Sequence, residues 1–263
     1  MSNNADRYAN RKVRKNKVSS RTAKQIQGTT EIVDESVSLG RDYDVSWFNP
    51  LPSQALAQSH ISNPDIDCVI VDGPAGTGKS STAIAKALVE LRKGNFKHIV
   101  FCKTPAEYGD DQIGFLSGNQ VEKLSAHFEV MRNIFLDFMD KVRLKKDEER
   151  GIIKFTIPNF LAGATLYDTL LIVDETQTLS DSTLKLVLER LGEGSKVFVL
   201  GDGKQCYAAK KRKDGFSNFI NKVTNTDAEG YRYSNEDLVA YVKLTSNDNM
   251  RSRFSKRVTE LYD

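Results

Sequence analysis

Short apolar runs alternate with amphipathic stretches along most of the chain. An apolar run of about four to eight residues, bounded by polar or glycine-containing stretches, is typical of a strand buried on both faces of a sheet. CVIVD, HIVFC and LLIVD are runs of this kind. Together with similar runs they predict strands over Cys68–Asp72, His98–Cys102, Ile152–Ile157, Leu170–Asp174, Lys196–Gly201 and Leu238–Leu244.

Helical periodicity fills most of the stretches between these runs. Apolar residues recur every three or four positions from Leu124 to Val142, as expected for one face of a long helix. The predicted helices are Lys79–Arg92, Val121–Val142, Thr183–Leu191 and Phe254–Tyr262, with a charged turn over Leu144–Arg150 and an ordered segment over Trp47–Pro52. Strands that alternate with helices predict an α/β fold, in which helices cover both faces of a mostly parallel sheet.

Length and charge divide the chain into a basic tail and a globular remainder. The 263 residues are 39% hydrophobic and 28% charged, which suits one sizeable domain or two small ones. Residues 1–27 hold eight Lys or Arg and one Asp, a net charge of +7, so the rest of a chain with net charge +3 carries −4. We expect a disordered tail over residues 1–27, a linker over 28–46 and a single domain over 47–263. The tail either holds phosphate groups nonspecifically or is a solvated extension without a function.

Some classes of protein do not fit this sequence. No apolar run approaches the roughly 20 residues of a membrane helix, and the N-terminus lacks the apolar segment of a secretory signal. The cysteines, Cys68, Cys102 and Cys206, lie far apart and form no CxxC pair, so we expect reduced thiols and neither disulfides nor a metal site. These features predict a cytoplasmic protein that does not associate with a membrane.

A glycine-rich loop after the first predicted strand carries the clearest chemistry. GPAGTGKS fits the phosphate-binding pattern G-x-x-x-x-G-K-[ST], and it lies between a strand and a helix as that pattern requires. In such a loop, backbone N–H groups point at the phosphates, Lys79 reaches the β- and γ-phosphates, and the hydroxyl of Ser80 coordinates Mg²⁺. The predicted nucleotide-binding residues here are Gly73, Pro74, Ala75, Gly76, Thr77, Gly78, Lys79, Ser80 and Ser81.

Two later strands end in polar residues that suit hydrolysis of a bound nucleotide. LLIVDETQ places Asp174 and Glu175 at the carboxyl end of a buried strand, the edge where ligands bind in open α/β sheets. We predict that Asp174 holds Mg²⁺ and that Glu175 is a general base for the attacking water. After KVFVLG, the amide of Gln205 is predicted to sense the γ-phosphate. A kinase does not need a Glu directly after this Asp, and a GTPase would need an N-K-x-D stretch where this chain has Asn221-Lys222-Val223-Thr224.

Together these segments resemble the PhoH family of P-loop ATPases, which is related to the superfamily 1 helicases. GPAGTGKS resembles the family's GPAGTGKT, and KTPAEYGDDQIGFLSG resembles its segment ending in GFLPG. VDETQTLS resembles its LDEAQN stretch, GDGKQ its GDPSQ stretch, and NMRSRFSKRVTELYD its RHPLV…Y tail. The resemblance covers nearly all of the chain beyond the tail. It implies a RecA-like core that hydrolyses ATP with Mg²⁺, acts with RNA or single-stranded DNA, and forms ring-like homo-oligomers such as a hexamer.

The resemblance also assigns roles to further residues. Gln177 falls on the glutamine of the DEAQ stretch. Gln54 lies in a segment similar to the region that grips adenine in related helicases, with Gln58 as a nearby competitor. Arg251 matches the arginine of RHPLV and would suit an arginine finger in the same or a neighbouring subunit, with Arg253 as the second choice.

The chain departs from the family at several basic positions. Ala162-Gly163-Ala164-Thr165 stands where the family has an RGRT stretch, and Thr104-Pro105 where it has Arg-Pro. The basic cluster Lys210-Lys211-Arg212-Lys213 either substitutes for the missing contacts or is a solvated loop. We therefore keep three hypotheses: a nucleic-acid-dependent ATPase, which we favour, a nucleotide-gated scaffold with slow turnover, and, least favoured, a P-loop kinase. A processive helicase is not expected, because about 215 residues supply only one RecA-like lobe.

Overall fold

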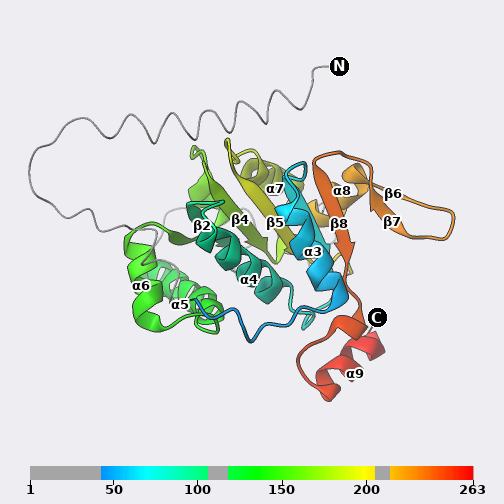
Figure 1. The fold of residues 1–263 in the computed structure, drawn as a ribbon, viewed down its shortest axis with the longest axis horizontal. Helices are drawn as coiled ribbons and strands as arrows, with labels where there is room; N and C mark the ends of the chain where they lie inside the picture. Colours follow the sequence, from blue (N-terminus) through cyan, green and yellow to red (C-terminus); the bar gives the residue numbers. More distant parts are fainter. Residues whose placement is uncertain (1–42, 106–117, 205–213, 263) are drawn as a thin grey trace, which may run out of the picture. The chain divides into compact units, whose positions relative to one another are not determined.

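A six-stranded sheet lies at the centre of this computed structural model, which describes residues 43–105, 118–204 and 214–262 (Figure 1). The sheet order is β3-β2-β4-β5-β1-β8, and every pair of neighbouring strands in it is parallel. This confirms the mostly parallel sheet predicted from the apolar runs. The strands are β1 (Cys68–Asp72), β2 (His98–Lys103), β3 (Ile153–Thr156), β4 (Thr169–Asp174), β5 (Lys196–Gly201) and β8 (Val239–Lys243).

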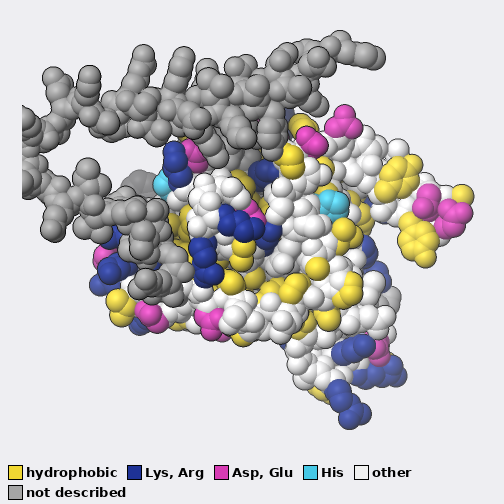
Figure 2. Space-filling model, in the orientation of Figure 1, with side chains coloured by type: hydrophobic (Ala, Val, Ile, Leu, Met, Phe, Trp, Pro, Cys, Tyr) yellow, Lys and Arg dark blue, Asp and Glu magenta, His cyan; other side chains and the backbone are white. Residues whose placement is uncertain are grey.

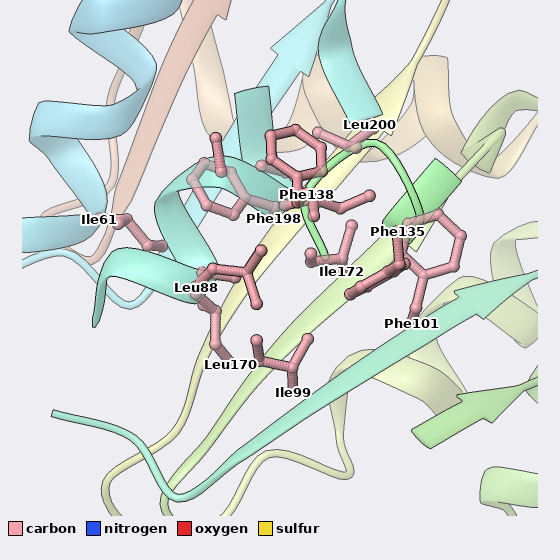
Figure 3. Close-up of a cluster of buried hydrophobic side chains, with 14 of the residues drawn as sticks. Ile61, Leu88, Ile99, Phe101, Phe135, Phe138, Leu170, Ile172, Phe198 and Leu200 are labelled. Atoms are coloured by element: carbon pink, nitrogen blue, oxygen red, sulfur yellow. The ribbon is translucent and has the colours of Figure 1, made fainter. Parts of the chain in front are cut away.

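Helices cover both faces of the sheet, which confirms the predicted α/β class. Consecutive residues of a strand point to opposite faces, so Val69 and Val71 of β1 join one apolar cluster while Cys68 and Ile70 join a second. Figure 3 shows the first cluster, in which Leu88 packs with residues of β4 and β5. The first cluster includes residues of α3 (Pro52–Ser62), α4 (Lys79–Arg92), α5 (Gly118–Phe135) and α6 (Lys141–Glu149), and the second includes residues of η1 (Pro158–Leu161), α7 (Asp181–Leu188) and α8 (Gly215–Val223).

The single helix predicted over Val121–Val142 is wrong at its C-terminal end, because the chain forms two helices there. α5 ends at Phe135, and α6 begins after Asp140, whose Oδ1 accepts a hydrogen bond from the backbone N–H of Arg143 at 2.8 Å. The charged turn predicted over Leu144–Arg150 is also wrong, since most of it belongs to α6. The apolar spacing continues across the break because Phe138 in the turn is fully buried.

Besides the break between α5 and α6, two described α-helices and one β-hairpin were not predicted from the sequence. α3 buries only Gln54, Ala57 and Ile61, so its amphipathic signal is weak. α8 begins after Asp214, whose side chain accepts a hydrogen bond from the backbone N–H of Phe216. After α8, β6 (Thr224–Thr226) and β7 (Arg232–Ser234) pair as an antiparallel hairpin, which carries hydrophobic and acidic side chains at the right of Figure 2.

The last part of the chain follows the prediction more closely. After β8 come η3 (Ser246–Asp248) and α9 (Arg253–Tyr262), and α9 matches the predicted closing helix to within one residue. Every helix within the three described ranges is too short or too polar to traverse a bilayer. The predicted tail over residues 1–27, most of the predicted linker, Gln205 and residues 210–213 lie outside the described residues.

Candidate nucleotide-binding site

The glycine-rich loop joins the end of β1 at Asp72 to the start of α4 at Lys79. Gly76 and Gly78 have φ angles of 85° and 70°, in the left-handed region that favours glycine. A Cβ on Gly76 would lie 2.8 Å from Nδ2 of Asn249, and a Cβ on Gly78 would lie 2.8 Å from Sδ of Met250. Both glycines are therefore required by the backbone conformation and by the close approach of a distant segment.

The side chain of Lys79 lies against the loop itself. Its Nζ donates hydrogen bonds to the carbonyl oxygens of Gly73 at 2.6 Å and Pro74 at 3.0 Å. Burial lowers the pKa of Lys79, and nearby carboxylates oppose that shift. The hydroxyl of Thr77, which is fully buried, also donates to the carbonyl oxygen of Pro74 at 2.8 Å. The loop thus holds a cation whose carbonyl partners can be exchanged for phosphate oxygens.

Ser80 and Asp174 meet at the carboxyl edge of the sheet. Oγ of Ser80 donates a hydrogen bond at 3.1 Å to Oδ1 of Asp174, which ends β4 and is 2% exposed. Lys103, which ends the neighbouring strand β2, places its Nζ 3.1 Å from Oδ2 of Asp174 and 3.7 Å from Oε1 of Glu175. Burial alone would lower the pKa of Lys103, but the two carboxylates outweigh burial and raise it. The single charge of Lys103 therefore offsets part of the negative charge of both acidic residues of the site.

Glu175 has a strained backbone and a side chain that water can reach. Its φ of 54° and ψ of 42° lie in the left-handed region, which is uncommon for a residue other than glycine. It directly precedes η2 (Thr176–Thr178), and its side chain is 43% exposed. Oε2 of Glu175 accepts a hydrogen bond at 2.6 Å from Nε2 of Gln177, and Oε1 of Gln177 accepts one at 3.2 Å from the backbone N–H of Asp202. Gln177 thus connects Glu175 to the loop after β5.

Asp72 forms a second polar cluster beside the loop. Its side chain is nearly buried, and Oδ1 accepts a hydrogen bond from the backbone N–H of Gly203 at 3.0 Å. Oδ2 accepts hydrogen bonds from the hydroxyl of Tyr241 at 2.8 Å and from Nζ of Lys243 at 2.7 Å. Burial and the charge of Asp72 raise the pKa of Tyr241. This cluster connects the phosphate loop to β8 and to the loop that follows β5.

The segment between η3 and α9 packs on the glycine-rich loop. The backbone N–H of Met250 donates a hydrogen bond to the carbonyl oxygen of Gly76 at 2.9 Å. Arg251 follows, anchored by a hydrogen bond from its backbone N–H to Oδ1 of Asn249 at 3.0 Å. Its side chain is exposed, and its Cδ is 3.3 Å from the position of a Cβ on Gly76, so Arg251 lies beside the loop of its own chain. Arg253 is also exposed, at the start of α9. Lys and Arg side chains gather over this helix in Figure 2.

Gln54, which was predicted to contact adenine, is fully buried against the loop. Its Oε1 accepts a hydrogen bond from the backbone N–H of Leu51 at 2.8 Å. Its Nε2 donates to the carbonyl oxygen of Thr77 at 2.9 Å and lies 3.0 Å from Sδ of Met250. Gln54 thus braces the loop from the start of α3. Gln58, one turn later, is partly exposed and donates to the carbonyl oxygen of Thr82 at 3.0 Å.

The predicted site residues within the described ranges lie in and around the glycine-rich loop and at the carboxyl ends of the strands. Gln177 lies in η2, and Ser81 lies in the first turn of α4. Within the described ranges, no group of three His, Cys, Asp or Glu side chains could hold a metal ion. Ser80 and Asp174 could therefore supply only part of a Mg²⁺ shell, and phosphate oxygens and water would complete it. The contacts of Lys103 were not predicted from the sequence, although Lys103 directly follows a predicted strand at this same edge.

Comparison with known proteins gives the same family as the motifs. A family model described as "PhoH-like protein" matches residues 51–263. The chain is 31% identical over 197 residues to the PhoH-like protein of Bacillus subtilis. This alignment covers 75% of this chain and 58% of the Bacillus protein. It is 30% identical over 190 residues to the PhoH-like protein of Mycobacterium tuberculosis H37Rv, covering 72% of this chain and 51% of the relative. The chain thus spans little more than half the length of these relatives.

Solved structures with a similar arrangement were also found. The large terminase of the thermophilic bacteriophage D6E aligns with a TM-score of 0.47 and 15% identity, over 82% of this chain and 51% of the terminase. The helicase domain of Hef from Pyrococcus furiosus aligns with a TM-score of 0.42 and 15% identity, over 77% of this chain and 40% of that domain.

Proposed function

Because this chain belongs to the PhoH-like family, we propose that it binds ATP with Mg²⁺ and hydrolyses it, and that RNA or single-stranded DNA is its partner. The observation that carries the first half is the 3.1 Å hydrogen bond between Ser80 and Asp174, directly beside Lys79 and Glu175. A phosphate loop by itself would suit many nucleotide enzymes. The carboxylates beside this loop favour attack by water. The family resemblance supports the second half.

The residues fit a Mg²⁺ site of the kind that nucleotides complete. Ser80 and Asp174 would hold the ion, since a hydroxyl and a buried carboxylate oxygen already lie within hydrogen-bonding distance of each other. When bound, Mg²⁺ would neutralise charge on the β- and γ-phosphate oxygens. Lys103 shares the carboxylate of Asp174, so it would release that carboxylate, or share it, when the ion arrives. Lys79 would leave the loop carbonyls to bind phosphate oxygens.

Glu175 is the residue that we assign to the attacking water. The oxygen of water would attack the γ-phosphorus while its proton passes to the carboxylate of Glu175, and ADP would leave with the electrons of the broken P–O bond. Gln177 fixes Oε2 of Glu175 at 2.6 Å, which holds the base in one rotamer. Because the other end of Gln177 contacts the backbone of Asp202, we propose that the same amide relays the state of the site to the loop that contains Gln205.

Arg251 and assembly are a further part of this proposal. Since Arg251 lies beside its own phosphate loop, we propose that it first stabilises phosphate charge in the same chain. We also propose that residues 47–263 act as a single ATPase domain and that copies assemble into a ring such as a hexamer. The buried free thiols of Cys68 and Cys102 suit a reducing compartment, so we place the protein in the cytoplasm. A mass above that of a monomer by light scattering with Mg-ATP is the expected result.

The test is an ATPase assay on the full chain with single-stranded RNA, single-stranded DNA and duplexes. We expect Mg²⁺-dependent hydrolysis that rises with at least one single strand, and a loss of about 100-fold or more in Glu175→Gln. Glu189→Gln is the matched control, because Glu189 is 53% exposed at the end of α7 and lies outside the site. If no nucleic acid changes the rate of hydrolysis, the proposed nucleic-acid partner is wrong. If Glu175→Gln hydrolyses ATP at the normal rate, Glu175 is not the general base.

A nucleotide-gated scaffold is the second candidate, and the position of Lys103 favours it. Lys103 neutralises Asp174 and contacts Glu175, so metal binding and base action both require this cation to yield. If Lys103 rarely leaves these two carboxylates, hydrolysis of the nucleotide will be slow. Very slow hydrolysis, together with an oligomer size that changes when ATP binds, would favour the scaffold over the nucleic-acid-dependent ATPase.

A further inference from the structure

A polar pocket lies on the other side of Asp72 from the phosphate loop. Its volume is about 510 Å³, within the range of about 300–1,000 Å³ that is usual for ligand pockets. α8, the β6–β7 hairpin, β8 and the loop after β5 contribute its walls. The lining side chains that matter here are Lys204, Asn221, Tyr231, Arg232, Tyr241 and Lys243.

The charge of this pocket suits an anion. Lys204, Arg232 and Lys243 line it together with one carboxylate, that of Asp72. That carboxylate already accepts hydrogen bonds from Gly203, Tyr241 and Lys243. Asp72 is therefore paired with Lys243 within the wall, and the other charged residues that line the pocket are Lys204 and Arg232.

The position of the Arg232 side chain is fixed by a neighbouring helix. Its Nη1 donates a hydrogen bond at 2.8 Å to Oδ1 of Asn221, which lies near the end of α8. A guanidinium group has five N–H donors, so this single bond leaves most of them for a phosphate. The hairpin and α8 thus hold an anion-binding group at the rim of the pocket.

An exposed aromatic ring stands beside these cations. Tyr231 is 74% exposed, and its backbone N–H is anchored at 2.7 Å to Oδ1 of Asp227 in the hairpin turn. Tyr233 in β7 is 50% exposed and adds a second exposed ring to the same hairpin. Large exposed rings next to cationic side chains are the combination by which proteins bind single-stranded nucleic acid, because bases stack on rings and phosphates meet cations.

We propose that this pocket binds a segment of single-stranded RNA or DNA, with a base stacked on Tyr231 and its phosphates held by Lys204, Arg232 and Lys243. The inference rests on the proposed function and specifies where the nucleic acid lies. It also accounts for the proximity of the pocket to the nucleotide site, since a strand in it would contact the residues that hold Asp72.

Asp72 connects the pocket to the phosphate loop. The hydroxyl of Tyr241 and Nζ of Lys243 face the pocket and hold Oδ2 of Asp72, whose backbone continues into Gly73. The carbonyl oxygen of Gly73 accepts a hydrogen bond from Nζ of Lys79 at 2.6 Å. A phosphate that draws Lys243 away from Asp72 therefore acts within a short chain of contacts on the lysine that binds ATP. Tyr241→Phe keeps the ring and removes only the hydrogen bond from the hydroxyl of Tyr241, so the contact between Lys243 and Asp72 remains.

The test measures binding of fluorescein-labelled oligo-U and oligo-dT to the full chain by fluorescence anisotropy at several salt concentrations. Tyr231→Ala is expected to weaken binding about tenfold, and Tyr231→Trp to restore it, because stacking needs only a ring. Arg232→Ala is expected to lower the slope of log affinity against log salt by about 1, and Arg232→Lys to preserve it. The two oligonucleotides distinguish RNA from DNA as the ligand.

Matched controls come from the opposite edge of the sheet. Tyr167 is 61% exposed and precedes β4, and Arg150 is exposed and precedes β3, so both lie at the amino ends of the strands. Tyr167→Ala and Arg150→Ala should bind oligonucleotide as the parent chain does. Melting temperatures of all variants identify any that fail to fold, and photocrosslinks from 4-thiouridine in oligo-U should map to Tyr231 or its neighbours.

Each outcome decides one point. If the parent chain binds strand and the Tyr231 and Arg232 variants bind equally well, with crosslinks elsewhere, the pocket is not the site while the proposed function stands. If free UMP competes as strongly as oligo-U, the pocket takes a mononucleotide and the strand assignment is wrong. If the parent chain binds neither oligonucleotide and hydrolyses ATP without stimulation, the nucleic-acid half of the proposed function fails, and this inference fails with it.

Discussion

The left-handed backbone of Glu175 allows strain and catalysis to be separated by a single substitution. Among the described residues, Glu175 and Asp168 are the two residues other than glycine with positive φ, at 54° and 48°. They lie at opposite edges of the sheet, because Glu175 follows β4 and Asp168 precedes it. Glycine adopts this conformation without a steric cost. Glu175→Gly and Asp168→Gly therefore relieve the same kind of strain, and only Glu175→Gly removes a carboxylate from the candidate site.

The expected effect on stability is small for both variants. Left-handed backbone costs a residue with a Cβ about 1–2 kcal/mol, which the substitution recovers. Glycine also makes the unfolded chain more flexible, which lowers the free energy of unfolding by about 0.5–1 kcal/mol. The lost ion pairs are exposed or partly exposed: Lys97 with Asp168 at 2.8 Å, and the more buried Lys103 with Glu175 at the longer distance of 3.7 Å. Such pairs contribute at most about 1 kcal/mol. The free energy of unfolding should stay within about 1 kcal/mol of the parent value.

The assay combines thermal unfolding with steady-state hydrolysis of Mg-ATP. We expect both variants to melt within about 4 °C of the parent chain. Glu175→Gly should hydrolyse ATP about 100-fold to 10,000-fold more slowly, the usual contribution of a general base, while Asp168→Gly should retain normal hydrolysis. Glu175→Gln completes the set, because it removes the negative charge and keeps the Cβ and the strain.

Two results would refute this reasoning. Hydrolysis near the parent rate in Glu175→Gly would show that the carboxylate is not the base. A loss in Glu175→Gly that Glu175→Gln does not reproduce would show that backbone conformation, and not proton transfer, is what Glu175 supplies.

Two further predictions concern charges that the fold buries. Burial alone would raise the pKa of Glu90, but hydrogen bonds from Lys86 and Asn95 lower it to about 2. The ionised carboxylate therefore contributes about 3 kcal/mol to the free energy of unfolding. This contribution is present above about pH 4.5 and is lost as the pH falls toward 2. In urea unfolding, Glu90→Gln should lower the free energy of unfolding at pH 7 and lower it much less at pH 3. An equal loss at both pH values would contradict an ionised Glu90. Glu149→Gln is the control, because Glu149 is exposed. Lys103→Met leaves Asp174 without its cation, so we expect a loss of about 3 kcal/mol in the free energy of unfolding, partly recovered with Mg-ADP. An equal loss with and without Mg-ADP would mean that Lys103 and the metal do not share Asp174.

The sheet could be predicted from the sequence because its strands are buried on both faces. An apolar run such as CVIVD or LLIVD is short and rich in β-branched residues, and these two features favour a strand over a buried helix. The break between α5 and α6 was hidden because Phe138 continues the helical spacing from within a turn. Asp140 carried the missing signal, since an Asp before a polar stretch is a preferred N-cap. Asp214 carried the same signal for α8.

The candidate site was predictable where its residues are close in sequence. Lys79 and Ser80 follow from the loop pattern, and Asp174 and Glu175 from their position after a strand. Lys103, Tyr241 and Lys243 belong to no such pattern. They reach the site because β2 pairs with β4 and β8 pairs with β1, and this strand order is not written in any one segment.

Gln54 makes tertiary contacts that its place in the sequence does not indicate. Its amide holds the carbonyl oxygen of Thr77 and contacts Met250, a residue 196 positions away. The phosphate loop is thus braced on one side by α3, which precedes it, and on another by the segment before α9. These contacts hold the loop from both ends of the domain. If the proposed function is correct, any movement of the loop on binding ATP would act on Met250 and the neighbouring Arg251, and so on the segment that leads into α9.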